Sequence, residues 1–109
     1  MWVFTKFGFY SAVQKKGTNH ITVRARVRLD LDKLREHYMP SLSTVIANAG
    51  SDYEYRSSIS KNDFAEGMKA IALDVNYENY KDEVAIESGA RSHLYSKVWA
   101  TLLELEGLD

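Results

Sequence analysis

The sequence has no cysteine, which excludes disulfide bonds and thiolate metal sites. Its three histidines, His20, His37 and His93, are not spaced as metal ligands, and no Gly-x-Ser-x-Gly nucleophile motif occurs. The six glycines stand singly, so there is no glycine-rich phosphate loop. We therefore expect no metal, no cofactor and no catalytic residue. A small enzyme whose site is assembled only by folding is the least favoured function.

Long apolar runs are also absent, and none approaches the roughly 20 residues that a membrane-spanning helix needs. The first residues lack the basic start, apolar run and small-residue cleavage site of a signal peptide. We therefore expect a cytoplasmic protein without a membrane partner.

The chain has 109 residues, of which 45% are hydrophobic and 27% charged, as in an ordinary globular protein. No linker-like or repeated segment occurs, so we expect one domain over residues 1–109. The net charge of −1 is unevenly distributed. Residues 1–61 hold 10 Lys/Arg and 5 Asp/Glu, whereas residues 62–109 hold 4 and 10. This asymmetry indicates either a basic binding face or two halves that attract each other, within one molecule or between two.

Aromatic, β-branched and alternating residues predict the strands. A strand with a bend at Gly8 is expected over residues 2–14, and a second, strictly alternating strand over 20–29. A brief strand at 44–47, a turn at 48–52 and a strand over 52–59 follow.

Apolar stripes at helical spacing predict the helices. The first covers residues 30–38, capped by Asp30 and stopped by Pro40. A capping sequence at Ser60 opens the second, whose face is expected to comprise Phe64, Met68, Ile71 and Val75. Two more helices are expected over 78–87 and 91–106. The order predicts an α+β fold, with an antiparallel sheet of three or four strands, helices on one face in a ferredoxin-like plan, and C-terminal helices.

Three arginines, Arg24, Arg26 and Arg28, occupy alternate positions of the second predicted strand. Guanidinium groups about 7 Å apart on one strand face can bind phosphates or carboxylates. The structural alternative is a solvent-facing surface neutralised by Asp52 and Glu54 across the sheet.

Arg56 follows two alternating tyrosines, Tyr53 and Tyr55, so it can form an anion site with their hydroxyl groups, or a surface salt bridge beside packed rings. Aromatic residues are also dense at residues 2–10, where alternation predicts Trp2, Phe4 and Tyr10 on one face and Phe7 and Phe9 on the other, unless Gly8 changes the register. An open sheet face with aromatics and arginines is typical of single-strand nucleic-acid binding. No RNP-type octapeptide occurs, which counts against an RRM domain.

The last predicted helix carries Leu94, Val98, Leu102 and Leu105 in one line. This apolar stripe predicts docking on the domain's own sheet, a symmetric dimer contact, or both. Residues 77–82 can bind an anion through Lys81, or form a helix junction in which Asn79 caps the helix.

Several segments together resemble a family of short, uncharacterised bacterial and phage proteins that open Met-Trp-x-Phe-Thr-x-x-Gly-Phe. They are residues 1–13, 23–26, 52–56, 77–82 and 95–99. The resemblance covers nearly the whole chain and implies a bacterial or phage cytoplasmic protein. It implies no activity and no role for any residue.

The sequence favours a non-catalytic binding module that associates with itself, as a dimer, and contacts an anionic partner through a sheet face. The candidate partner-binding residues are Arg24, Arg26, Arg28, Arg56, Tyr53, Tyr55 and Trp2. The alternative function is single-stranded nucleic-acid binding.

Overall fold

The computed structural model describes residues 1–48 and 52–108, so the turn predicted at 48–52 lies mostly outside the described residues. The chain divides into two compact units, Met1–Val75 and Asn76–Asp109. We expected no internal boundary, because no proline-, glycine- or serine-rich linker marks this one. Each unit is described by itself.

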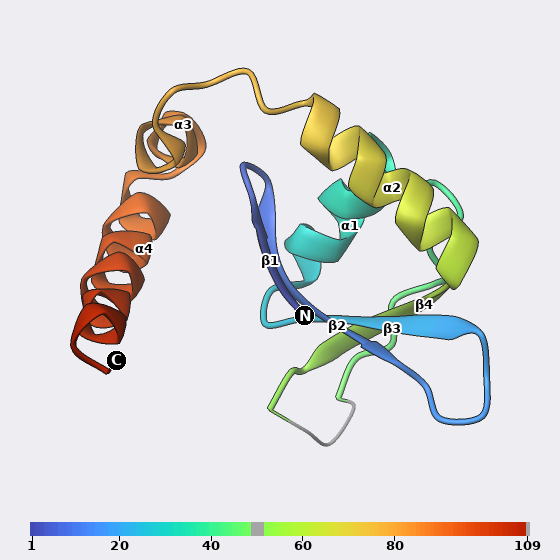
Figure 1. The fold of residues 1–109 in the computed structure, drawn as a ribbon. Coiled ribbons are helices and arrows are strands. Elements are labelled where there is room, and N and C mark those ends of the chain that lie inside the picture. Colours follow the sequence, from blue (N-terminus) through green and yellow to red (C-terminus); the bar gives the residue numbers. More distant parts are fainter. Residues whose placement is uncertain (49–51, 109) are drawn as a thin grey trace. The chain divides into compact units, whose positions relative to one another are not determined.

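The N-terminal unit contains a four-stranded antiparallel sheet in the order β1-β2-β3-β4 (Figure 1). The strands are β1 (Trp2–Thr5), β2 (Gly8–Gln14), β3 (His20–Ala25) and β4 (Tyr55–Ser60). Two helices, α1 (Arg28–His37) and α2 (Lys61–Leu73), lie on the same side of the sheet (Figure 1). This confirms the predicted α+β class, with helices on one face of an antiparallel sheet. The strands lie in sequence order.

The first fourteen residues form a hairpin, not the single bent strand that we predicted. The Thr5 hydroxyl closes the turn by accepting hydrogen bonds from the backbone N–H groups of Phe7 (3.2 Å) and Gly8 (3.1 Å). Glycine is required here because a Cβ at position 8 would lie 2.6 Å from the Tyr10 hydroxyl oxygen and 2.7 Å from Asp30 Cγ. The turn also brings Phe9 opposite Phe4 on the neighbouring strand.

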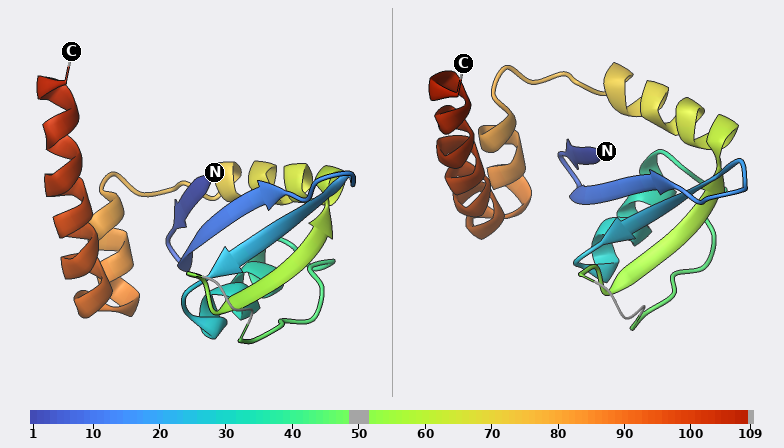
Figure 2. Two further views of the ribbon diagram at one scale, coloured as in Figure 1. Left: turned by 90° about the horizontal axis from the view of Figure 1, so that it is seen from below. Right: turned by 60° about the horizontal axis from the view of Figure 1, so that its bottom comes forward.

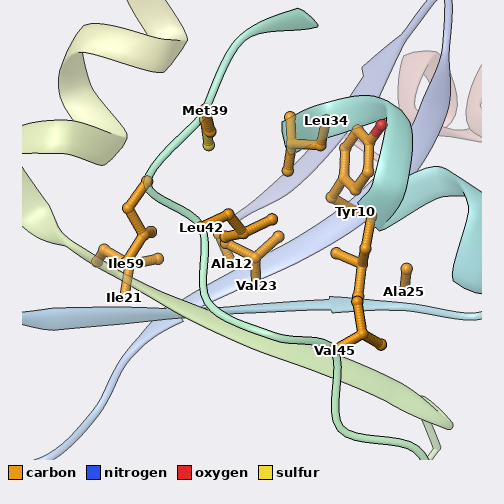
Figure 3. Packing of buried hydrophobic residues seen from close by; sticks show 11 residues of the cluster. Tyr10, Ala12, Ile21, Val23, Ala25, Leu34, Met39, Leu42, Val45 and Ile59 are labelled. Atoms are coloured by element: carbon orange, nitrogen blue, oxygen red, sulfur yellow. The ribbon is translucent and has the colours of Figure 1, made fainter. Parts of the chain in front are cut away.

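The hydrophobic core lies between the sheet and the two helices. Ala12, Ile21, Val23 and Ile59 point into it from the strands, and Leu34 joins them from α1 (Figure 3). The predicted face of α2 packs against this core through Phe64, Met68 and Ile71. Val75, which we placed on the same face, lies beyond the end of α2 and is exposed. The other buried core residues are Tyr10, Ala25, Leu31, Met39, Leu42 and Val45.

The strand predicted over residues 20–29 is β3, and it is shorter than predicted. The chain leaves the sheet after Ala25, and α1 begins at Arg28. The expected cap, Asp30, lies inside the first helical turn, and the N-cap residue Val27 makes no side-chain cap bond. Asp30 is buried and accepts a hydrogen bond from the Phe9 N–H at 3.1 Å. It therefore connects α1 to β2, and an acidic residue in this turn also suits the helix dipole.

The segment between α1 and β4 is held beside the sheet by Arg35. Its guanidinium group donates to the backbone oxygens of Leu42 (3.0 Å) and Ser43. Ser43 N–H donates to the Ser58 carbonyl at 2.9 Å, and Ile46 forms an isolated antiparallel bridge with Arg56. The brief strand predicted at 44–47 is thus reduced to one bridge, but it places this segment along the edge of β4.

Helix capping follows the sequence closely. The Ser60 hydroxyl accepts from Asp63 N–H at 3.1 Å, which confirms the predicted start of α2. In the C-terminal unit, Asn79 accepts from Asp82 N–H at 3.0 Å and opens α3 (Tyr80–Glu87). Ser88 ends α3 and caps α4 (Gly89–Leu102), which continues as a 3₁₀ turn, η1 (Leu103–Gly107).

The C-terminal unit buries few of its apolar side chains. Val84 and Tyr95 are the buried residues among those described, and the Tyr80 and Tyr95 rings stack at 5.9 Å. Seven large apolar residues of this unit are exposed: Ile86, Leu94, Trp99, Leu102, Leu103, Leu105 and Leu108. Across the described parts of both units, no helix combines the length and the apolar content needed to cross a bilayer.

Candidate functional site

The sheet face that points away from α1 and α2 is called the outer face here. Side chains alternate between the two faces of a strand, so residues between core positions point outward. Figure 2, left, views the molecule from below Figure 1, the side opposite the two helices. By strand register, the outer face carries Trp2, Phe4, Phe9, Ser11, Val13, Thr22, Arg24, Arg56 and Ser58.

Arg24 and Arg56 lie directly opposite each other on β3 and β4. On its other side Arg24 faces Ser11. The predicted neutralisation by Asp52 and Glu54 therefore does not occur in the ladder, because the cross-strand neighbours of Arg24 are a serine and a second arginine. A favourable cross-strand pair stabilises a sheet by roughly 0.2–1 kcal/mol, whereas two like charges directly opposite each other destabilise it. An anion between the two guanidinium groups would remove this repulsion.

Arg24 is held in place by a hydroxyl group and an aromatic ring. Its Nη2 donates to the Ser11 hydroxyl at 2.8 Å, and its guanidinium carbon lies 4.8 Å from the centre of the Tyr53 ring. The Arg26 guanidinium carbon lies at the same distance, 4.8 Å, from that ring, and its Nη1 donates to the Asp52 carbonyl at 3.1 Å. Tyr53 is 6% exposed, so one buried ring supports two arginines.

The Nε atom of Arg24 is buried and has no hydrogen-bond partner among the described residues. Neither Arg24 nor Arg26 forms an ion pair within the described part of the chain. The positive charge of Arg24 is therefore not neutralised by an ion pair within the described residues.

An open depression of about 540 Å³ lies beside this arginine pair. Four cationic or ionisable bases line it: Lys15, His20, Arg24 and Arg56. Hydroxyl groups come from Thr18, Thr22, Ser43 and Ser58, and the described lining includes no aspartate or glutamate. Arginine and hydroxyl donors without competing carboxylates suit a phosphate or carboxylate group. We call this depression the basic site.

Three aromatic rings form a cluster on the same face. Phe4 and Phe9 stack at 4.5 Å, and Trp2 meets Phe9 edge-on at 5.8 Å. The alternation changes at the turn of residues 6 and 7, as the alternative at Gly8 allowed, so Phe9 joins Trp2 and Phe4 on this face and Tyr10 lies in the core. Trp2 is 69% exposed, so most of its ring is available for contact. We call Trp2, Phe4 and Phe9 the aromatic cluster.

Five of the seven candidate residues lie on or against the outer face: Trp2, Arg24, Arg26, Tyr53 and Arg56. The other two do not join them. Arg28 is the first residue of α1, outside the sheet, and Tyr55 packs against the core. We did not predict Lys15 and His20 as site residues. The sequence could have indicated them, because they lie on either side of the β2–β3 turn. Residues paired across such a turn point to the same face of the hairpin.

A second polar cluster of this unit is already satisfied internally. Asp74 accepts a hydrogen bond from the Tyr38 hydroxyl at 2.5 Å and pairs with Lys6 at 3.1 Å. The Tyr38 hydrogen bond, followed by that of Lys6, lowers the pKa of Asp74 from its ordinary value. His37 stacks on Phe7 beside them at 3.9 Å. These contacts connect the end of α2 to α1 and to the β1–β2 turn, which is a structural role.

The described residues contain no group of three or more His, Asp or Glu placed to hold a metal ion. Comparisons with protein family models, with curated proteins and with solved structures gave no match. The resemblance to short bacterial and phage proteins therefore stays a prediction.

Proposed function

We propose that the protein is a non-catalytic binding module that holds an anionic partner on the outer face of its sheet. The observation that carries this proposal is the directly opposed pair Arg24 and Arg56. Opposite charges or neutral side chains directly across the two strands would be the more favourable cross-strand pair. A negatively charged partner turns the repulsion into two charge-assisted contacts.

Inorganic tripolyphosphate is a suitable probe, because it offers several phosphate oxygens and no other chemistry. We expect it to bind by titration calorimetry and to raise the melting temperature, as any ligand of the native state does. Arg24→Gln and Arg56→Gln should each weaken binding by about 10-fold, the range for losing a hydrogen bond to a charged group.

Arg28→Gln is the matched control, because it removes the same charge from the same unit outside the sheet. Equal losses of affinity in all three variants would show that binding depends on net charge and not on the Arg24–Arg56 pair. No binding by the wild-type protein at low salt would refute the anion site itself.

We also propose that the protein associates with itself, through a second copy at the apolar side of α4. Leu94 and Leu102 are both more than half exposed and lie eight residues apart, about two helical turns, on one side of the helix. The two units also differ in charge sign: residues 1–75 hold 11 Lys/Arg and 8 Asp/Glu, and residues 76–109 hold 3 and 7. The basic unit of one copy can therefore attract the acidic unit of another.

The test is the mass in solution by light scattering, compared with 12.4 kDa for one chain. Leu94→Glu with Leu102→Glu should convert a dimer into a monomer. Leu29→Glu, at an equally exposed leucine of α1, should not. A wild-type monomer at high micromolar concentration would exclude self-association.

A further inference from the structure

The aromatic cluster and the basic site lie on one face, and this juxtaposition narrows the class of partner. Pairing across the sheet runs from Trp2 to Ser11, from Ser11 to Arg24, and from Arg24 to Arg56. These four residues therefore form one row that crosses all four strands. Neighbouring strands are about 4.8 Å apart, so Trp2 and Arg24 are separated by roughly 10 Å along the row. A short segment of one chain can contact both.

We propose that the outer face binds single-stranded nucleic acid, with bases on the aromatic cluster and phosphates at the basic site. This rests on the anion-binding function proposed above and names its partner. Base stacking on exposed aromatic rings together with a cationic backbone groove is how sheet surfaces hold single strands.

The arrangement fits a single strand better than the other polyanions. A free phosphate or an acidic peptide uses the arginines and has no need of an exposed tryptophan ring. A duplex keeps its bases stacked inside, so Trp2 cannot reach their flat faces. Trp2 meets Phe9 at nearly a right angle and is 69% exposed, so much of the residue remains open to solvent. Stacking on it requires no rearrangement of the core.

The neighbouring residues give the strand a path across the face. Phe4 and Phe9 form the row beside Trp2 and Ser11, and Thr22 and Ser58 form the row on the other side of the arginine pair. Lys15 extends the positive charge toward the β2–β3 turn, and His20 lies beside it in the basic site. One side of the path is thus aromatic, and the other side is basic with hydroxyl donors. A single strand likewise presents flat bases on one side and a charged phosphate backbone on the other.

The experiment measures fluorescence anisotropy of labelled strands of about 12 nucleotides, oligo(dT) and oligo(rU), at low salt; about 12 lies within the usual site size of a sheet surface. Wild-type protein should bind both or one of them. Trp2→Ala should weaken binding by about 5-fold or more, the lower end of what one base–aromatic stack contributes. Arg24→Gln should weaken it by about 10-fold. With roughly three phosphate contacts, raising the salt from about 50 to about 200 mM should weaken binding about 20-fold.

A second measurement reports stacking directly, because the chain has two tryptophans. In a Trp99→Phe variant the remaining fluorescence comes from Trp2, and the bound strand should quench it. In a Trp2→Phe variant the remaining fluorescence comes from Trp99 of the C-terminal unit and reports whether the strand also contacts that unit. Trp2 is exposed, so Trp2→Ala should fold normally.

The outcomes separate this inference from the anion site on which it rests. If an abasic strand or a glutamate-rich peptide binds as tightly as oligo(dT) and Trp2→Ala has no effect, the anion site stands and the nucleic-acid inference is wrong. Tighter binding to a duplex of the same length also overturns it. If neither tripolyphosphate nor any strand binds, both proposals fail.

Discussion

The two units of this protein differ in how well they bury their own apolar residues. The N-terminal unit closes a core between a four-stranded sheet and two helices, with eleven buried hydrophobic residues in one cluster. Among its described residues, the C-terminal unit buries Val84 and Tyr95 and exposes seven large apolar side chains. The first unit has what an independent fold needs. A helical pair of 34 residues gains little stability from so small a core.

The largest effect is expected from the core of the N-terminal unit. Leu34 of α1 is 1% exposed and packs among strand residues of the cluster. Leu34→Ala should lower the free energy of unfolding by about 2–5 kcal/mol, the usual loss for a buried leucine. Urea unfolding measures it. Leu29→Ala, at an exposed leucine of the same helix, should change stability by less than about 0.5 kcal/mol. Similar losses in the two variants would contradict the described packing.

The next effect is expected within the C-terminal unit. Val84→Ala removes its most buried aliphatic side chain and should destabilise α3 and α4 by about 1–3 kcal/mol. Amide hydrogen exchange should quicken in residues 80–102 and stay unchanged in β2 and β3. Faster exchange in both units would show that they unfold as one. Ala85→Gly, at an exposed position of α3, is a control for helix propensity alone, with a cost of about 1 kcal/mol.

The sequence predicted the N-terminal unit well where one periodic signal decided the structure. The alternation over residues 20–25 correctly separated Ile21, Val23 and Ala25 from Thr22 and Arg24, and Ser60 was correctly identified as a helix cap. It predicted poorly where tertiary contacts decided. The hairpin turn in residues 2–14 depends on Thr5, whose hydroxyl competes with strand pairing in a way that composition does not reveal.

The candidate site was predicted in part for the same reason. The arginine spacing placed Arg24 on the outer face correctly but could not show that Arg56 is its cross-strand neighbour, because that depends on the register between β3 and β4. Arg28 was included because the alternation continues to Leu29, although the chain turns into α1 before it. The residues of one strand do not determine which residues of a distant strand will pair with them.

A smaller effect is expected where α2 approaches the loop after α1. A Cβ at Gly67 would lie 2.4 Å from Met39 Cγ, and Met39 is buried. Gly67→Ala gains about 1 kcal/mol of helix propensity but forces an overpacked core that costs about 1–3 kcal/mol, so a net loss of about 1 kcal/mol is expected. Thermal unfolding measures the difference. In a Met39→Ala background the obstructing side chain is gone. Adding Gly67→Ala to that variant should therefore raise its stability by the gain in helix propensity. Failure to recover it would mean that Met39 is not the cause.

The smallest effect is expected from Asp74, which follows α2 and lies one residue before the end of the N-terminal unit. Its pKa is lowered in the folded protein, so the charged form is favoured by folding. This stabilisation is fully present above the unfolded value, near about 3.9, and is lost as the pH falls through the lower folded pKa. Asp74→Asn should therefore be less stable than wild type at neutral pH, and the difference should shrink steadily in acid.

Melting temperatures from neutral pH down to strong acid measure the effect of Asp74→Asn, with Glu66→Gln as an exposed carboxylate of α2 for comparison. A difference that does not depend on pH would show that the substitution acts through packing alone. A loss confined to neutral pH would show that the ion pair with Lys6 and the Tyr38 hydroxyl hold the end of α2. That is the point where the well-packed unit ends and the poorly packed one begins.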